Sequence, residues 1–293
     1  MSAKILDGKK LNEKIANELA AKIRGLTPKP KLVIIQVGNL AESNAYIARK
    51  KSFGEKIGAI VDHIKLPQDV VKQALLSEIR NLNSDSSVHG VIVQMPLPKH
   101  LDRDKIIEAI DPKKDVDGLT STNLKLLWEG RSQGYVPATT KGILSLLDYY
   151  KIPVTGQKVV VVGRSFLVGK PTALAFLNRD ATVTVAHSKT KNLKLETRNA
   201  DILVVAAGKP DLITKEYVSK GQVVVDVGIT AIDQLPATKN QKLEMELVKK
   251  KLVGDVDFES VRNIVEAISP VPGGTGPMTV ASLFENLFEA YNR

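Results

Sequence analysis

The chain has 293 residues, of which 43% are hydrophobic, so it can bury a core in each of two domains. It contains no cysteine, which excludes disulfides and cysteine-ligated zinc, and its four histidines are too far apart in sequence for a local chelate, so we expect no metal site. The formal net charge of +10 fits a nucleic-acid binder or an enzyme with polyanionic ligands, and the spread of basic residues and an aromatic content of 4% favour the enzyme.

Short β-branched segments alternate with longer amphipathic segments along the first half, a pattern typical of parallel sheets covered by helices. The predicted elements are, in chain order, a helix at 8–24, a strand at 32–37, a helix at 45–57, a strand at 60–66, a helix at 70–81 and a strand at 90–95. Segment 111–140 is rich in Asp, Gly, Ser, Thr and Pro and has little periodicity, so we expect ligand-facing loops there.

The second half shows the same alternation and predicts a Rossmann-like succession. A helix at 141–150 is followed by predicted strands at 158–162, 181–186, 201–206, 222–227 and 252–255, then by a Pro-Gly loop at 270–277 and a final helix ending near residue 291. We therefore predict an α/β fold with two three-layer domains and a cleft between them. Residues 1–140 plus 270–293 would form one domain, and residues 141–269 would form a dinucleotide-binding domain.

The segment from Lys158 to Leu177 predicts a strand, a glycine turn and a helix that begins near Pro171. Free N–H groups at the start of that helix would point at a phosphate. Gly163 and Gly169 are six residues apart with no glycine between them, however, so the G-x-G-x-x-G fingerprint is absent. The same segment would also serve as a tight strand-to-helix turn in any α/β domain.

The next predicted strand ends at His187, Ser188 and Lys189, a place where NAD-selective enzymes usually carry an Asp or Glu that bonds the ribose hydroxyls. No carboxylate is present here to repel a 2′-phosphate. Ser188 and Lys189 can donate hydrogen bonds to such a phosphate, and Arg164 can offer its planar guanidinium. Together these residues favour NADP, although each of them taken alone also fits an ordinary solvated loop.

The segment from Ser43 to Lys50 opens a predicted helix, with Ser43 as its N-cap. Tyr46 and Lys50 are four residues apart and share a helix face. A lysine beside an aromatic ring in a dry cleft has a lowered pKa and can act as a base near neutral pH. The alternative for this pair is a surface lysine packed on a tyrosine.

Two further polar side chains and one loop provide context for that pair. Gln94 lies at the C-terminal end of a buried strand, where ligands collect. Asp117 lies at a glycine turn, where it either accepts hydrogen bonds from an amino-heterocycle or only stabilises the turn. The loop at 270–277 is rigid and poor in side chains, which suits a flat ligand or simply a helix start, and Thr279 lies on the following turn.

In this order and spacing, five motifs resemble the bifunctional methylenetetrahydrofolate dehydrogenase/cyclohydrolase family, called FolD in bacteria. They are SNAYIARK, VIVQMPLP, DVDGL, GRSFLVGKP and PVPGGTGPMTV, and the resemblance covers essentially the whole chain. It implies oxidation of 5,10-methylenetetrahydrofolate by hydride transfer to NADP, then hydrolysis of the methenyl cation to 10-formyltetrahydrofolate in the same cleft.

By matching position, Lys50 resembles the family's catalytic lysine, which manages protons mainly in the hydrolysis. Gln94 resembles the residue that orients that lysine, Tyr46 the aromatic that packs on the folate, and Asp117 the carboxylate that binds the pterin's amino-pyrimidine; all four are the expected catalytic residues. Expected substrate-binding positions are these four with Pro272, Gly273, Gly274 and Thr279. Expected cofactor-binding positions are Gly163, Arg164, Ser165, Val168, Gly169, Pro171, His187, Ser188, Ala207, Gly208, Gly228, Ile229 and again Thr279.

The chain departs from the family pattern in one place. Many members read P-C-T-P-x-G where this chain has Ala138 in place of the Cys and Thr140 in place of the second Pro. Because of this departure, the family pattern does not predict the shape of that loop. The dehydrogenase and cyclohydrolase reactions need no thiol.

The resemblance also implies partners. Tetrahydrofolate derivatives, including polyglutamylated ones, would be the substrates, and the chain would form a homodimer. Because NADP and polyglutamylated folates are polyanions, the positive charge needs no nucleic acid. The first ten residues lack a hydrophobic signal core and no apolar run approaches roughly 18 residues, so we expect a cytoplasmic protein without membrane contacts. The alternatives are a single-activity NADP-dependent dehydrogenase of the same architecture and a basic nucleic-acid-binding protein.

Overall fold

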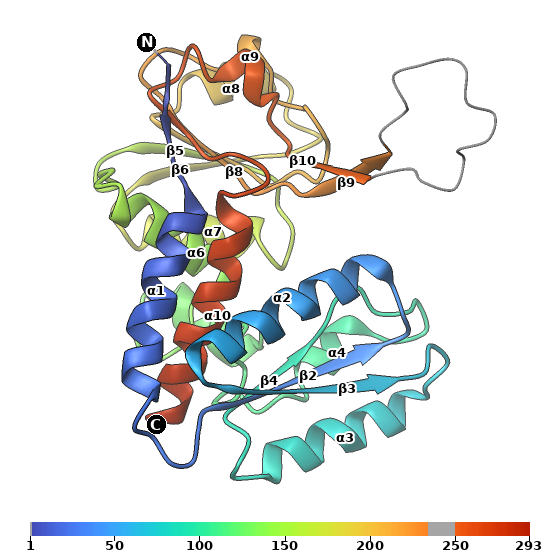
Figure 1. Ribbon diagram of the computed structural model, residues 1–293. Helices are drawn as coiled ribbons and strands as arrows, with labels where there is room; N and C mark the ends of the chain where they lie inside the picture. The colour runs from blue at the N-terminus through green and yellow to red at the C-terminus, as the bar shows by residue number, and fades with distance from the viewer. Residues whose placement is uncertain (1, 234–249) are drawn as a thin grey trace, which may run out of the picture. The chain divides into compact units, whose positions relative to one another are not determined.

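The computed structural model describes residues 2–233 and 250–293, which fold into two compact α/β units (Figure 1). The three-stranded unit comprises Lys10–Ser145 and Met278–Arg293, and the six-stranded unit comprises the described residues of Met1–Lys9 and Leu146–Pro277. Each unit has a parallel sheet, so the predicted fold class of two α/β domains with parallel sheets is confirmed. Within the described residues, no helix is both long enough and apolar enough to cross a membrane.

The three-stranded sheet has the order β3-β2-β4, with β2 (Lys31–Val37) between β3 (Ile60–Leu66) and β4 (Gly90–Val93). The chain moves from β2 to one side through α2 (Ala41–Ile57), then across to the other side through α3 (Lys72–Ser84). Because parallel crossovers are right-handed, this change of direction puts the two helices on opposite faces of the sheet, as Figure 1 shows. The central strand is therefore covered on both faces, and its last six residues are buried.

Helices cover this sheet through apolar side chains. On one face, Ile35 of β2 belongs to a buried cluster with Leu75 of α3 and Ile106 of α4 (Arg103–Ile107). On the other face, the Phe53 ring of α2 lies 5.1 Å from the Phe284 ring, centroid to centroid.

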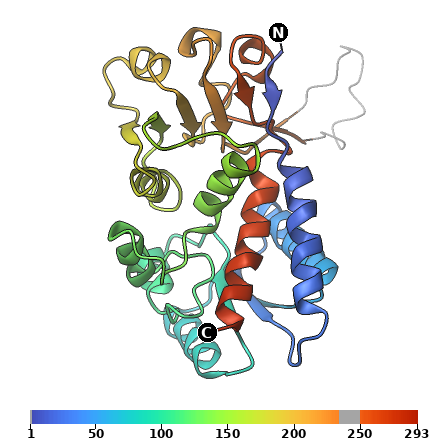
Figure 2. The ribbon, with the colours of Figure 1, turned by 90° about the vertical axis from the view of Figure 1, so that its left-hand side faces the viewer.

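Phe284 belongs to the last helix, α10 (Thr275–Tyr291). α10 lies beside α1 (Gly8–Ile23) in Figure 2, and the Lys22 ammonium of α1 lies 5.6 Å from the Phe288 ring centroid. The C-terminal helix is therefore part of the core of the three-stranded unit.

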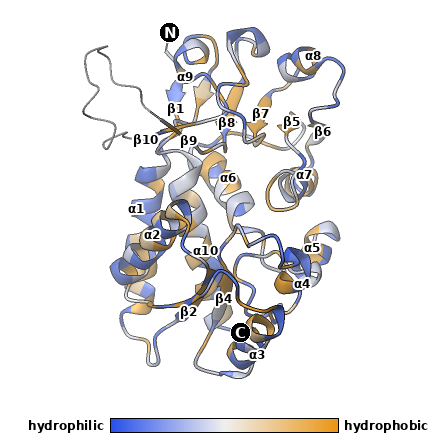
Figure 3. Cartoon of the chain, turned by 90° about the vertical axis from the view of Figure 1, so that its right-hand side faces the viewer, coloured by the Kyte–Doolittle hydropathy of each residue, from blue (hydrophilic) through white to orange (hydrophobic). Residues whose placement is uncertain are grey.

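The six-stranded sheet contains only parallel pairs. Its order is β1-β11-β8-β7-β5-β6, which span Lys4–Ile5, Ala267–Ile268, Val223–Asp226, Ile202–Val205, Lys158–Val162 and Thr182–Ala186. β7 and β8 are fully buried and β5 nearly so, and Figure 3 shows their apolar character. The chain passes from β5 to β6 on one side and returns to β7 on the other, so the carboxyl ends of β5 and β7 form the topological switch point at which α/β sheets bind ligands.

The prediction that residues 252–255 continue the parallel sheet was wrong. β10 (Lys250–Val253) pairs antiparallel with β9 (Thr230–Asp233) in a separate two-stranded sheet. The parallel sheet is instead extended beyond β8 by β11 and β1. These strands have two residues each and are too short to produce a hydropathy pattern. The remaining elements are α5 (Ser121–Trp128), α6 (Ala138–Tyr149), α7 (Gly169–Leu177), α8 (Leu193–Arg198), η1 (Lys215–Tyr217) and α9 (Phe258–Val261).

Two predicted helix starts were also displaced. α2 begins at Ala41, so Ser43 is not its N-cap; the Ser43 hydroxyl instead donates a hydrogen bond to the Met95 carbonyl, at 3.3 Å. α7 begins at Gly169 rather than near Pro171. At the start of α7 the extra turn is held by local bonds from the N–H groups of Gly169 and Lys170 to Ser165.

Candidate active site

A lysine and a glutamine meet at the end of β4. The Lys50 ammonium on α2 donates to the Gln94 side-chain oxygen at 2.9 Å, and the Gln94 amide nitrogen donates to the Met95 carbonyl at 3.0 Å. The Gln94 backbone N–H is held by Ile35 of β2 at 2.8 Å. Since both ends of the glutamine amide are engaged, its oxygen is oriented toward Lys50.

Tyr46 lies one turn before Lys50 on α2, as the helical spacing predicts, and both side chains are half-buried. The guanidinium of Arg49 lies 5.6 Å from the Tyr46 ring centroid. One face of the tyrosine ring therefore carries a cation, while its helix neighbour Lys50 is bonded to Gln94.

Asp117 lies in a loop that the carboxylate of Asp115 stabilises. The buried Asp115 accepts a hydrogen bond from the Gly118 N–H at 3.0 Å, and its other oxygen accepts from the Thr120 N–H at 2.7 Å and from the Asn123 side chain at 2.9 Å. Gly118 has φ of +73°, which favours glycine. Sequence reasoning gave no role to Asp115, although it belongs to the DVDGL motif.

Burial shifts the pKa values of Lys50 and Asp117 in opposite directions. It lowers the pKa of Lys50, and the negative charge of Asp117 opposes that shift. It raises the pKa of Asp117, which Lys50 opposes and Asp115 reinforces. Burial also raises the pKa of Tyr46, with Arg49 acting against it. The site therefore contains a lysine that is more readily neutral than a free lysine, electrostatically coupled to a carboxyl group.

Thr279 belongs to the same three-stranded unit as these residues. Its hydroxyl is 3.3 Å from the Thr139 hydroxyl, at the start of α6. Ala138 and Thr140, the two departures from the family pattern, are both buried in that first turn, and the Ala138 N–H donates to the Asp117 carbonyl at 3.2 Å. The altered loop thus continues directly into a regular helix.

The predicted nucleotide loop follows β5 in the six-stranded unit. Gly163 has φ of +123°, and a Cβ there would lie 2.2 Å from the Ala206 carbonyl oxygen, so the loops after β5 and β7 touch. The Ser165 hydroxyl accepts from the Val168 and Gly169 N–H groups at 3.3 and 3.2 Å, and its carbonyl accepts from Lys170 at 3.1 Å.

These bonds correct one expectation about phosphate binding. Three N–H groups at the start of α7 that were predicted to be free for a phosphate are bonded to Ser165 instead, and Pro171 has no N–H. Exposed polar side chains beside the loop, Arg164 and Ser165, remain available to an anion.

The loop after β6 forms a compact turn next to the nucleotide loop. The His187 N–H donates to the Thr190 hydroxyl at 2.9 Å, and its ring accepts from the Lys189 N–H at 3.1 Å. The side chains of Ser188 and Lys189 are exposed. Because β5 and β6 are in register up to their last residues, the segment with Arg164 and this turn leave the sheet side by side.

Two buried aspartates hold the loops after β7 and β8, and sequence reasoning missed both. Asp255 accepts from the Ala207 and Gly208 N–H groups at 2.6 and 2.8 Å. Asp226 accepts from the N–H groups of Gly228, Asp255 and Val256, each at 3.0 Å. The N–H groups of Ala207, Gly208 and Gly228 are thus occupied within the protein, so any contact of these residues with a cofactor must use other atoms.

The loop that precedes α10 is fixed within the six-stranded unit. The Gly273 carbonyl accepts from the N–H groups of Gly8 and Lys9 at 2.9 and 3.2 Å, and Gly274 donates to Pro270 at 2.7 Å. Gly273 has φ of +117°. Of the predicted folate-side residues, Pro272, Gly273 and Gly274 belong to this unit, whereas Tyr46, Lys50, Gln94, Asp117 and Thr279 belong to the other.

Comparison with known proteins decides the family. Residues 6–117 match the model of the tetrahydrofolate dehydrogenase/cyclohydrolase catalytic domain, and residues 137–293 match that of the NAD(P)-binding domain. The chain belongs to the tetrahydrofolate dehydrogenase/cyclohydrolase family. The predicted bifunctional activity in folate one-carbon metabolism and the predicted dinucleotide-binding second domain are thereby confirmed.

Relatives match over the full length of the chain. The bifunctional protein FolD of Acholeplasma laidlawii is 46% identical, with 98% of each chain covered, and that of Aquifex aeolicus is 43% identical, with 99% of this chain and 96% of the relative covered. Among solved structures, the bifunctional FolD of Campylobacter jejuni is 40% identical, covers 99% of both chains and has a TM-score of 0.92. The Trypanosoma brucei FolD, solved with NADP and an inhibitor, is 33% identical, covers 100% of this chain and 98% of its own, and has a TM-score of 0.93.

Proposed function

We propose that this tetrahydrofolate dehydrogenase/cyclohydrolase oxidises 5,10-methylenetetrahydrofolate with NADP and hydrolyses the methenyl product to 10-formyltetrahydrofolate, with Lys50 as the group that manages protons in the hydrolysis. The hydrogen bond from Lys50 to Gln94 carries this proposal. Addition of water to the methenyl carbon releases a proton, which a neutral amine can accept. Burial favours the neutral form of Lys50 by lowering its pKa. Gln94 accepts one N–H of that amine, which leaves the lone pair to point elsewhere.

The neighbouring residues would bind the folate. Asp117 is suited to accept two hydrogen bonds from the amino-pyrimidine of a pterin, because carboxylates bind paired N–H donors in this way. Tyr46 offers an aromatic face for packing against a flat ring system. Pro272, Gly273, Gly274 and Thr279 would complete the folate and nicotinamide sides. When bound, NADP would supply the hydride acceptor for the oxidation.

Replacing Lys50 with Met tests the proton role. We expect Lys50→Met to abolish the hydrolysis of methenyltetrahydrofolate but to retain NADP binding. The hydrolysis is measured as the decrease in the absorbance of methenyltetrahydrofolate. Lys56→Met is the matched control, because Lys56 lies on the same helix but pairs at the surface with Glu13. A Lys50→Met enzyme with normal hydrolysis would remove Lys50 from the mechanism, and a wild-type enzyme that forms no 10-formyl product would favour a single-activity dehydrogenase.

We also propose that NADP is preferred over NAD. The support is the exposed Ser188 and Lys189 in the turn after β6, with Arg164 in the adjacent loop and no carboxylate in the turn. The assay supplies methylenetetrahydrofolate with either cofactor and follows reduced cofactor and methenyl product together. Reduction with NAD alone would overturn this proposal.

The remaining cofactor contacts are proposals of the same kind. We propose that the cofactor-binding residues are Gly163, Arg164, Ser165, Val168, Gly169, Pro171, His187, Ser188, Ala207, Gly208, Gly228, Ile229 and Thr279. For Ala207, Gly208 and Gly228 the contact would be through carbonyl or Cα atoms, since their N–H groups are bonded to Asp255 and Asp226.

Domain limits, assembly, location and substrate charge complete the proposal. We propose a catalytic domain of residues 1–140 plus 270–293 and a cofactor domain of residues 141–269; these limits differ from those of the two compact units at residues 1–9, 141–145 and 270–277. We further propose a cytoplasmic homodimer that acts on polyglutamylated folates. The net charge of +10 supports electrostatic attraction of such polyanions. Raising the ionic strength should therefore raise the Michaelis constant for a polyglutamylated folate, and an unchanged constant would contradict the electrostatic attraction.

A further inference from the structure

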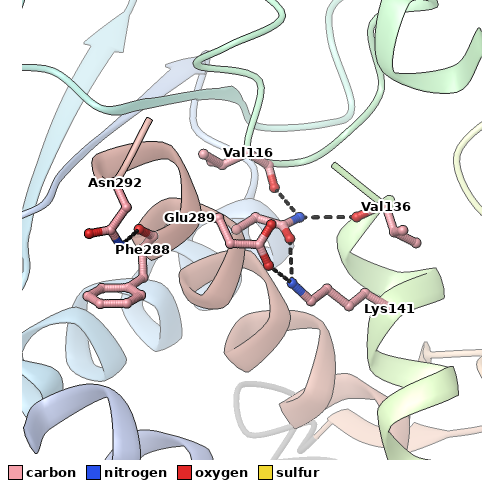
Figure 4. A network of polar contacts seen from close by, with 7 residues as sticks. Val116, Val136, Lys141, Phe288, Glu289 and Asn292 are labelled. Atoms are coloured by element: carbon pink, nitrogen blue, oxygen red, sulfur yellow. Dashed lines mark hydrogen bonds and ion pairs between the residues drawn. The ribbon is translucent and has the colours of Figure 1, made fainter. Parts of the chain in front are cut away.

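Asn286 of α10 is fully buried and bonds two separate loops, at Val116 and Val136, both labelled in Figure 4. Its amide nitrogen donates to the Val116 carbonyl at 2.9 Å and to the Val136 carbonyl at 3.0 Å. Its oxygen accepts from the Lys141 ammonium at 2.9 Å. Both N–H donors and one lone pair of this side chain are thus used inside the three-stranded unit.

The two carbonyl groups belong to the two segments that are linked directly at Asp117. The Val116 carbonyl belongs to the peptide bond that joins Val116 to Asp117. Val136 directly precedes the segment whose Ala138 N–H bonds to the Asp117 carbonyl at 3.2 Å. Asn286 therefore joins the loop that carries Asp117 to the start of α6, while Asp115 holds the same loop through the Gly118 and Thr120 N–H groups.

Lys141 determines the orientation of the Asn286 amide. Its ammonium bonds both the Asn286 oxygen and the Glu289 carboxylate, the latter at 2.6 Å. Because an ammonium group only donates hydrogen bonds, it selects the oxygen of Asn286 and turns the amide N–H groups toward the two loops. Glu289 is one turn further along α10, so the helix supplies both acceptors of Lys141.

We propose that Asn286 is a positioning residue for folate binding, which sets the backbone of Asp117 so that its carboxyl group meets the substrate. This inference rests on the proposed role of Asp117 as the group that binds the folate. It assigns to the C-terminal helix a specific part in substrate recognition, through hydrogen bonds to the loop rather than contact with the substrate.

Asn286→Asp is the direct test. The change keeps the volume and the bond to Lys141 but replaces the donor that serves two buried carbonyl groups by an oxygen, so the loop must move. We expect the Michaelis constant for methylenetetrahydrofolate to rise tenfold or more, the turnover number to fall less than that, and the dissociation constant for NADP to change less than twofold. Asn292→Asp is the matched control, since Asn292 is exposed directly after the end of the same helix and donates to the Phe288 carbonyl at 2.7 Å.

A purely structural role would change both ligands. Equal losses of folate and NADP binding in Asn286→Asp, or an unchanged Michaelis constant for folate, would overturn the proposal. If Asn286→Asp is not recovered folded, Lys141→Met takes its place, because this variant keeps the amide donors of Asn286 but removes the cation that orients them. Lys141→Met should raise the Michaelis constant for methylenetetrahydrofolate severalfold, and an unchanged Michaelis constant would overturn the proposal. Asp117→Ala distinguishes the role of Asp117 from that of Asn286. If Asp117→Ala binds folate normally, the proposed role of Asp117 fails as well. If Asp117→Ala binds folate poorly but Asn286→Asp binds it normally, only the positioning role of Asn286 is rejected.

Discussion

Replacing Asp226 with Asn tests whether the buried aspartate pair makes stability depend on pH. Burial raises the pKa of Asp226 to about 7 from its ordinary value of 3.8, three backbone N–H bonds oppose this shift, and the nearby Asp255 reinforces it. The carboxyl group therefore binds its proton more tightly in the folded chain than in the unfolded chain, and protonation favours folding. The stability that this group contributes is complete below about pH 4 and is lost as the pH rises through about 7.

The size of the effect follows from the pKa difference. Each pH unit between the two pKa values lowers the free energy of unfolding by about 1.4 kcal/mol. From pH 4.5 to 6.5, the wild-type chain should therefore lose about 3 kcal/mol relative to Asp226→Asn, which has no carboxyl group to titrate at this position. Asn also sets an amide group against backbone N–H donors, which costs roughly 1–3 kcal/mol at every pH. The test therefore depends on how the free energy of unfolding changes with pH, and not on the constant difference between the two proteins.

The assay is denaturant unfolding of both proteins across this pH range. Asp211→Asn is the control, because Asp211 is exposed in the same unit and its φ of +50° suits Asn as well as Asp. The wild-type curve should fall relative to the Asp226→Asn curve, and the Asp211→Asn curve should follow the wild type. Parallel curves for the wild type and Asp226→Asn would refute the reasoning.

Three further substitutions test the loops and the core. In Gly163→Ala, the new Cβ would lie 2.2 Å from the Ala206 oxygen at a φ of +123°, so NADP binding measured by calorimetry should be lost, and normal affinity would contradict the proposed loop contact. Ser165→Ala removes the hydroxyl that accepts from the Val168 and Gly169 N–H groups and should lower the free energy of unfolding by about 1 kcal/mol, with an unchanged value counting against a stabilising role of these bonds. Gly54→Ala places a Cβ 2.3 Å from a valine methyl of β3 and should lower the midpoint of thermal unfolding through overpacking worth about 1–3 kcal/mol, whereas Gly25→Ala, which meets open space, should not; equal midpoints would contradict the packing argument.

Local sequence was sufficient to predict most of the framework. β-branched runs such as 158–162 form strands wherever helices cover them, and their alternation with amphipathic segments predicts a parallel sheet. Tyr46 and Lys50 share a face because helical periodicity alone places them there. The sequence motifs predicted the family, since each of them combines a special backbone shape with a chemical group.

Only the tertiary structure showed how the candidate site is held. Lys50 meets Gln94 across 44 residues of sequence, and Asn286 meets Val116 across 170. The partners of Asp226 and Asp255 come from loops after different strands, and the two-residue strands β1 and β11 exist only because a neighbouring strand pairs with them. Hydropathy and spacing report which face of an element is buried, whereas the partner of a buried polar group depends on which loops the fold brings to the same sheet edge.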